Sequence, residues 1–258
     1  MSKNFEITKE LAKRVLDTVD AGLVSGMGVP IPGQMCVEAA VCFAMGLPHS
    51  DEPTCVSPAL RQLKITLNDA SGWSSNESRA KGLRRLALAQ LGSAGVLDEK
   101  VFAQEVALMT VRTVVADALD HAASVHPDEH HRQALRCAAE NCRSGRDAAY
   151  AAYAAAAIYA DAADAAADAA GAYAADAVYA AAAAARAYAA DAAADAIYAD
   201  AAAARAYAAD AAAYAAAAAD AAAARAYAEK VLSDFAENVV QILIKMNAPG
   251  CAWLHLTE

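Results

Sequence analysis

Residues 186–210 read RAYAADAAADAIYADAAAARAYAAD, and this composition decides the fold of the second half of the chain. Between positions 148 and 228, 55 of the 81 residues are alanine, and most of the others are Tyr, Asp or Arg. Alanine has the highest intrinsic helix propensity, so the segment is predicted to be helical. Regularly interleaved tyrosines argue against disorder, which is the competing interpretation of a biased composition.

A weak internal repeat runs through this segment. The run Arg186-Ala-Tyr188-Ala-Ala-Asp191 recurs from Arg205 to Asp210, and a degenerate copy starts at Arg225. The repeat indicates helical units of similar length. A stripe of nearly pure alanine lets helix backbones approach closely, so we expect residues 146–258 to form a closely packed bundle that ends in an amphipathic helix from about Glu229 to Met246.

Helix signals also fill the first half, and no run of alternating β-type residues is present. We expect an N-terminal multi-helix module over residues 1–145 and an all-α fold for the whole chain. The sequence predicts helices over Thr8–Asp20 and Gln34–Met45, separated by a turn at Gly26–Gly33. A third helix starts at Ser57-Pro58, and a fourth follows a Ser74/Glu77 capping box and runs to Leu91. Asp98 caps a helix that runs to Ala123, and a further helix starts at Pro127.

Charge and cysteine usage exclude several classes of function. The net charge is −10, so the chain as a whole does not attract DNA or an anionic membrane. Asp or Arg interrupts every stretch of the tail that could span a bilayer, and the N-terminus lacks the apolar core of a signal peptide. Six cysteines without a Cys-x-x-Cys pair indicate reduced thiols rather than zinc or disulfides, so we expect a cytoplasmic protein.

Basic residues gather in one stretch of the N-terminal module. A local basic patch with an aromatic residue can hold a phosphate-bearing small ligand. Tyrosines and arginines of the tail can add stacking faces and anion partners. The candidate ligand-binding residues are Arg61, Lys64, Trp73, Arg79, Lys81, Arg84, Arg85, Arg186, Tyr188, Arg205 and Tyr207. The alternative is that the basic residues form solvated helix faces and that tyrosine fills gaps between alanine helices.

Cys36 carries an alternative hypothesis, in which the chain is a cysteine-dependent hydrolase or transferase. It lies at the predicted start of a helix, where a thiol has a lowered pKa and can act as a nucleophile. His49 and Asp51 would complete a triad. Against this stand the absence of the β-sheet that carries the histidine in papain-like enzymes and the frequency of cysteine as a small core residue.

A cluster of histidines and acids is a candidate metal site. His121, His126, His130 and His131 occur with Asp117, Asp120, Asp128 and Glu129, and two of the pairs have i,i+4 spacing. Pro127 disrupts the local helix, so a solvated helix junction is the preferred interpretation. We therefore predict no metal and no cofactor.

The run from Gly33 to Cys42, the segment Leu67-Asn68-Asp69 and the Ala/Tyr/Asp-rich tail together resemble a group of uncharacterised bacterial and bacteriophage proteins, and the tail is similar to alanine-rich immunity-type proteins. The resemblance implies a role in phage–host or inter-bacterial conflict, and it brings no catalytic residues. We expect a non-enzymatic, oligomeric binding protein whose partner is a small anionic ligand, such as a nucleotide-type immune signal, or another protein.

Overall fold

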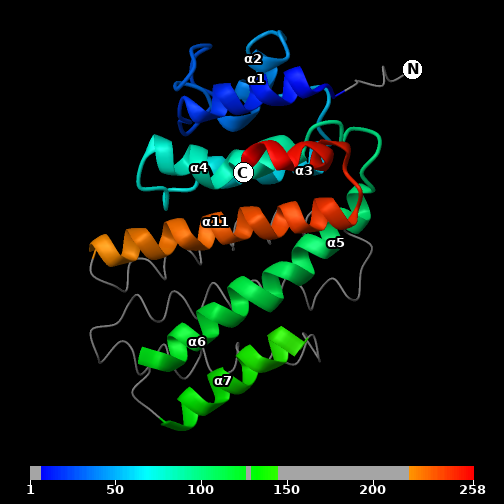
Figure 1. Cartoon of the computed structure of the whole chain (residues 1–258). Coiled ribbons are helices and arrows are strands. Elements are labelled where there is room, and N and C mark those ends of the chain that lie inside the picture. The colour runs from blue at the N-terminus through cyan, green and yellow to red at the C-terminus, as the bar shows by residue number, and fades with distance from the viewer. Residues whose placement is uncertain (1–6, 126–128, 145–220) are drawn as a thin grey trace. The chain divides into compact units, whose positions relative to one another are not determined.

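The computed structural model describes residues 7–125, 129–144 and 221–258 (Figure 1). Its helices are α1 (Lys9–Asp20), α2 (Val37–Ala44), α3 (Pro58–Asp69), α4 (Asn76–Ala89), α5 (Glu99–Thr110), the π-helical turn η1 (Val111–Val115), α6 (Ala116–Val125), α7 (Glu129–Ser144), α11 (Ala221–Lys245) and the 3-10 helix η2 (Pro249–Thr257). These described residues contain an isolated bridge between Gly28 and Met35 but no strand. The predicted all-α fold is confirmed.

The chain divides into two compact units. The first unit comprises Met1–Ala103 together with Leu232–Glu258, and the second comprises Gln104–Val231. The chain from Leu232 to Glu258 therefore belongs to the same unit as the first helices. The predicted boundary between residues 145 and 146 lies outside the described residues, so the division into 1–145 and 146–258 stays a prediction.

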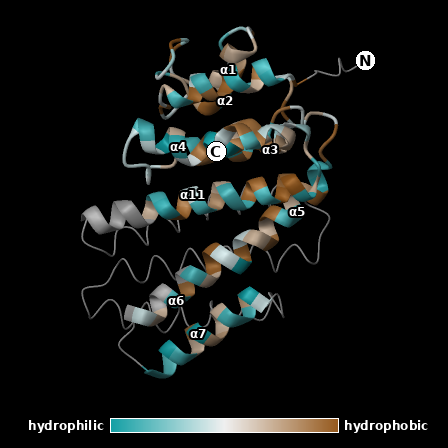
Figure 2. Cartoon of the chain, viewed as in Figure 1, coloured by the Kyte–Doolittle hydropathy of each residue, from teal (hydrophilic) through white to brown (hydrophobic). Residues whose placement is uncertain are grey.

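Amphipathic helices build the core of the first unit. Helix α1 packs against α2 and α4, and η2 covers parts of α1 and α4. On α1, Leu11, Val15 and Val19 recur every four residues and are buried. Figure 2 shows polar and apolar residues alternating along α4 and α11, as expected of helices with one face in a core.

Most predicted helix starts in the first unit are confirmed. Thr8 caps α1, and Ser57 caps α3 with proline in the first turn. The predicted capping box of α4 was wrong by one residue. Ser75 is the N-cap, and Ser78 returns the second hydrogen bond through its hydroxyl, so a serine takes the place of the expected glutamate.

Helix α11 ends at Lys245, one residue from the predicted end at Met246. Asn247 adopts a positive φ of 56°, and the amide of Ala248 donates to the carbonyl of Leu243 at 3.0 Å. This Schellman arrangement ends the helix, and Pro249 then opens η2. The η2 backbone then lies tight against α4, because a Cβ at Gly250 would come within 2.2 Å of the Leu88 carbonyl oxygen.

In the second unit, α6 and α7 form a packed pair that also contacts η1. The predicted helix from Asp98 toward Ala123 contains the π turn η1, next to which the Thr110 and Thr113 hydroxyls each donate to a backbone carbonyl four residues earlier at 2.8 Å. Back-bonding of this kind slightly destabilises an α-helix, and a π turn interrupts its regular hydrogen bonds.

Candidate functional site

A loop with an unusual backbone connects α1 to α2. Gly28 and Gly33 have positive φ values of 70° and 85°. A Cβ at Gly28 would lie 2.0 Å from the carbonyl oxygen of Gln34, and a Cβ at Gly33 would lie 2.7 Å from that of Ala21. Both positions therefore require glycine, for conformation and for space. We call residues 26–33 the apolar loop.

Backbone hydrogen bonds close the apolar loop on itself. The Val29 amide donates to the Gln34 carbonyl at 2.8 Å, and the Gln34 amide donates to the Ile31 carbonyl at 2.9 Å. At the base, the Cys36 amide donates to the Met27 carbonyl at 3.2 Å. The path of the loop is thus fixed by internal bonds.

Two side chains anchor the loop from outside. Asp69, the last residue of α3, accepts a hydrogen bond from the Gly26 amide through Oδ1 at 2.7 Å. His49 Nε2 lies 3.1 Å from the carbonyl oxygen of Gly28. Both contacts join segments far apart in sequence, so they hold the loop against the helices that follow it.

Asn68 and Arg79 fix the chain on either side of the apolar loop. The Asn68 amide group donates to the Val24 carbonyl at 2.8 Å, and its oxygen accepts from the Val37 amide at 3.2 Å. Arg79 is buried, and its guanidinium donates to the carbonyls of Asn68 and Leu23 at 2.8 and 2.9 Å. Desolvation lowers the pKa of Arg79. This arginine serves the fold and does not face solvent as an anion ligand.

The outer side of the loop is apolar and exposed. Met27, Val29 and Ile31 are 44%, 45% and 51% exposed, and Pro30 and Pro32 are exposed as well. No charged residue occurs between positions 22 and 37. Contiguous exposed apolar residues on a soluble surface are typical of interaction sites.

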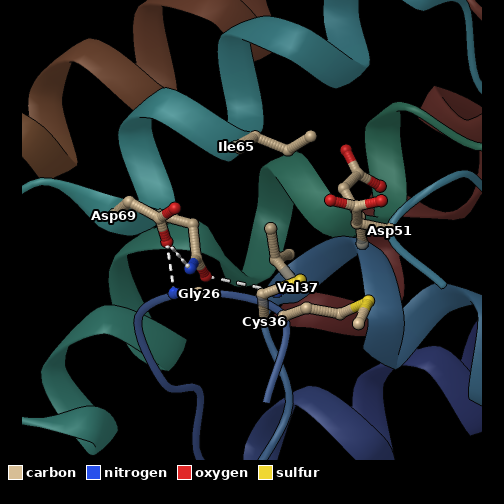
Figure 3. A pocket seen from close by; sticks show the side chains of 9 residues that line it. Gly26, Cys36, Val37, Asp51, Ile65 and Asp69 are labelled. Atoms are coloured by element: carbon tan, nitrogen blue, oxygen red, sulfur yellow. Dashed lines mark hydrogen bonds between the residues drawn. The ribbon is translucent and has the colours of Figure 1, made fainter. Parts of the chain in front are cut away.

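A small hollow lies at the base of the loop (Figure 3). It has a volume of about 20 Å³, which is room for about one water molecule. Its lining residues are Gly26, Met27, Cys36, Val37, Glu38, Asp51, Ile65, Asn68 and Asp69. Figure 3 shows Asp69 and Gly26 on one side of the hollow and Asp51 on the other. Three carboxylates line it, of which Glu38 is paired with Lys64 and Asp69 interacts electrostatically with Arg79.

A fully buried ion pair lies at one wall of the hollow. Lys64 Nζ is 3.6 Å from Glu38 Oε1, and both side chains are completely inaccessible. Gln90 Nε2 donates to Glu38 Oε2 at 3.2 Å. Burial raises the pKa of Glu38 and lowers the pKa of Lys64, and the attraction between the two charges opposes both changes.

The predicted ligand-binding cations are dispersed and mostly engaged. The ion pairs are Arg61 with Glu52 at 3.1 Å, Lys64 with Glu38 at 3.6 Å, Arg84 with Asp20 at 2.7 Å and Arg85 with Glu237 at 2.9 Å. Arg84 and Arg85 also donate to Thr257 in η2, and Lys81 is exposed. The Asp20 hydrogen bond raises the pKa of Arg84. Arg84 and Arg85 tie α4 to its neighbours, and the structure does not bring the predicted cations together around a common recess.

Trp73 is a core residue. It is 7% exposed, and its indole Nε1 donates to the Leu67 carbonyl at 2.9 Å. Its ring lies over Gly82, where a Cβ would approach the ring to 2.5 Å. A buried ring in this position offers no face for a ligand to stack on.

Cys36 is the N-cap of α2 and lies outside the first helical turn. Its sulfur accepts a hydrogen bond from the Ala39 amide at 3.3 Å. The expectation of a lowered pKa was wrong, because burial raises the pKa of this thiol. Among the described residues, no hydrogen bond joins Cys36 to His49 or Asp51, so the arrangement does not form the predicted triad.

The other predicted sites are only partly visible. Arg186, Tyr188, Arg205 and Tyr207 lie outside the described residues. Of the histidine and acid cluster, Asp117 and Asp120 pair with Arg143 at 2.9 and 2.5 Å. The described ranges hold no group of three or more His, Cys, Asp or Glu side chains arranged for a metal ion.

Sequence reasoning missed the features that define the site. Glu38 interrupts an otherwise apolar run from Met35 to Met45, and Lys64 lies between apolar residues of α3. A charge inside an apolar run is the signal for a buried, paired group. Exposure of Met27, Val29 and Ile31 had no signal in sequence, because apolar residues beside Pro and Gly look the same whether buried or exposed.

Comparisons with known proteins place the chain in no family. No family model, no curated protein and no solved structure matches it. Of the helices that the structure describes, none is long and apolar enough to span a membrane.

Proposed function

We propose that this chain is a non-enzymatic binding protein that docks onto a protein partner through the apolar loop. The observation that carries the proposal is the exposure of Met27, Val29 and Ile31 on a backbone held by glycine geometry and tertiary hydrogen bonds. A rigid apolar surface loses little conformational entropy on binding, and its lack of charge removes a desolvation cost. Both properties suit recognition of a macromolecule.

The positions of the basic residues favour this version over binding of a small anion. Arg61, Arg84 and Arg85 pair with carboxylates, and Arg79 is buried on backbone carbonyls. A nucleotide-type ligand would have to break these contacts or bind elsewhere. Sequestration of such a signal, bacteriophage origin and self-association stay predictions, and the tail residues proposed for them lie outside the described ranges.

A site-specific crosslink tests the proposal. A benzoylphenylalanine photocrosslinker replaces Ile31 in one sample and Val96, which is 57% exposed, in another. After irradiation in cells that naturally produce the chain, proteins captured at position 31 and not at 96 are identified, expressed and titrated by calorimetry. We expect at least one of them to bind the purified full-length chain.

Matched variants then assign the binding to the loop. The double substitution V29S/I31S removes two exposed apolar side chains but leaves the backbone bonds in place. We expect this variant to bind ~30-fold more weakly or worse. That factor corresponds to the ~2 kcal/mol that partial burial of two aliphatic side chains contributes to binding. V96S should change the Kd less than ~2-fold. Equal binding by the loop variant, or no purified protein that binds, would refute the proposal.

A further inference from the structure

The methionines of this chain differ in how far they are shielded from solvent. Five of the six lie in the described part of the chain, and of these Met27, in the apolar loop, is the exposed one, at 44%. Met35 is buried at 1%, and Met45, Met109 and Met246 are half-buried. The Met45 sulfur also accepts a hydrogen bond from a thiol at 3.4 Å, and the Met109 sulfur lies 3.5 Å from a hydroxyl. The apolar loop therefore presents the most accessible thioether of this set.

Exposure decides the reactivity of a thioether, because oxidation starts at a lone pair of the sulfur. With a hydroperoxide, the sulfur attacks one peroxide oxygen, so that an S–O bond forms and the O–O bond breaks. The other oxygen leaves as hydroxide and takes up the proton to become water. Sulfur is oxidised by two electrons and the peroxide is reduced by two. The product, methionine sulfoxide, is a polar side chain in place of an apolar one.

The loop backbone does not depend on the Met27 side chain. The Met27 carbonyl accepts its hydrogen bond from the Cys36 amide, and the bridge between Gly28 and Met35 is formed by main-chain atoms. Oxidation of the sulfur leaves these bonds in place. The shape of the loop is thus retained while the polarity of its outer side changes.

The added oxygen would lie on a surface that is otherwise apolar. Val29 and Ile31, at 45% and 51% exposure, belong to the same outer side of the loop, and no charged residue occurs between positions 22 and 37. A partner surface that accepts these apolar side chains offers no donor to a sulfoxide oxygen at Met27. Burial of an acceptor without a hydrogen bond opposes association.

We propose that Met27 is a reversible oxidation site whose sulfoxide turns off docking through the apolar loop. This inference rests on the proposed function, since docking is the activity that it regulates. The oxidant is a hydroperoxide, and enzymes of the methionine sulfoxide reductase class return the thioether. The chain docks while Met27 is reduced and releases its partner when peroxide oxidises it.

Peptide mapping of the full-length chain after treatment with hydrogen peroxide measures the rate at each methionine. We expect Met27 to form sulfoxide ~10-fold faster than Met35 and ~3-fold faster than Met45, Met109 or Met246, because burial restricts access to the sulfur. In urea the five rates should become equal. A Met27 rate in the folded chain no higher than that of the half-buried methionines would overturn the oxidation site.

The photocrosslinker at position 31 measures the effect on docking. The chain is oxidised, freed of peroxide with catalase and irradiated in an extract of the cells that produce it. We expect the yield of the position-31 adducts to fall ~10-fold, the effect of one buried acceptor without a donor, and to recover after treatment with methionine sulfoxide reductases. M27L keeps an apolar side chain that peroxide does not oxidise, so its adducts should be unchanged.

The two proposals fail in different ways. Equal adduct yields from the oxidised and reduced chains, or a loss that also occurs in M27L, would overturn the switch and leave docking in place. Absence of specific adducts at position 31 from the reduced chain would refute docking and the switch together. The oxidation rates are measured on the chain alone, so they assign the reactive sulfur in either case.

Discussion

Removing one partner of the buried Glu38–Lys64 pair should make stability depend on pH in a direction set by the partner that remains. In K64M, Glu38 stays enclosed without its counter-charge, so the folded state must bind a proton there. The unfolded chain loses that proton above the ordinary pKa of 4.5. At pH 7 the protonation costs up to ~3 kcal/mol, at about 1.36 kcal/mol per pH unit. At pH 5 it costs less than ~1 kcal/mol, so this variant becomes more stable as the pH falls.

The complementary variant should respond with the opposite sign. In E38Q, Lys64 must be neutral in the folded state, although its ordinary pKa is 10.5. The unfolded state then binds the extra proton, and the cost of up to ~5 kcal/mol at pH 7 decreases as the pH rises. Chemical denaturation between pH 5 and pH 9 measures both slopes.

The double variant E38Q/K64M serves as the control, because it leaves no charge buried at this position and should show the wild-type pH dependence. Slopes of the two single variants that match the wild type would refute the reasoning. That result would mean that each remaining charge stays ionised in the folded state, by reaching water or another partner.

Three further experiments test the packing of two glycines and the exposure of two thiols. G28A should lower the free energy of unfolding by ~1–3 kcal/mol, because alanine would have to adopt a positive φ and its Cβ would lie 2.0 Å from a carbonyl oxygen. Urea denaturation measures this loss, and a neutral effect would contradict a fixed loop. G82A should gain ~1 kcal/mol of helix propensity but lose ~1–3 kcal/mol by overpacking against Trp73, so we expect its melting temperature not to rise. A higher melting temperature would show that the ring moves away. Iodoacetamide followed by mass spectrometry should label the exposed Cys137 ~10-fold faster than the buried Cys36, and the reverse order would revive the thiol as a nucleophile.

Local signals in the sequence predicted the helices well, and tertiary contacts explain the rest. Thr8, Ser57 and Asp98 act as N-caps through bonds to the amide three residues later, so adjacent sequence contains all the information. The α4 capping box shifted by one residue because two neighbouring serines satisfy the same pattern. The role of Asn247 depends on its φ, which its residue type permits but does not dictate.

The candidate site was harder to predict, because its residues meet across long sequence separations. Lys64 was expected to face a ligand, since a lysine near arginines indicates a basic surface. It is buried instead, because α2 places Glu38 opposite it. Arg79 likewise bonds to the carbonyl of Leu23, more than fifty residues away. Pairing of this kind depends on how helices pack, which a single sequence without relatives does not reveal.

One helix couples the buried pair to the exposed loop. Three residues of α3 make this connection. Lys64 pairs with Glu38, and Asn68 accepts a hydrogen bond from the first amide of α2. Asp69 accepts one from the Gly26 amide at the base of the apolar loop. Since the first two are one helical turn apart, a shift of α3 against α2 that brings Lys64 out of register also displaces Asn68. A buried ion pair adds little stability compared with apolar residues of equal size, but it fixes register where a purely apolar contact would slide. The pair therefore sets the position of α2 relative to α3, and through it the shape of the apolar loop.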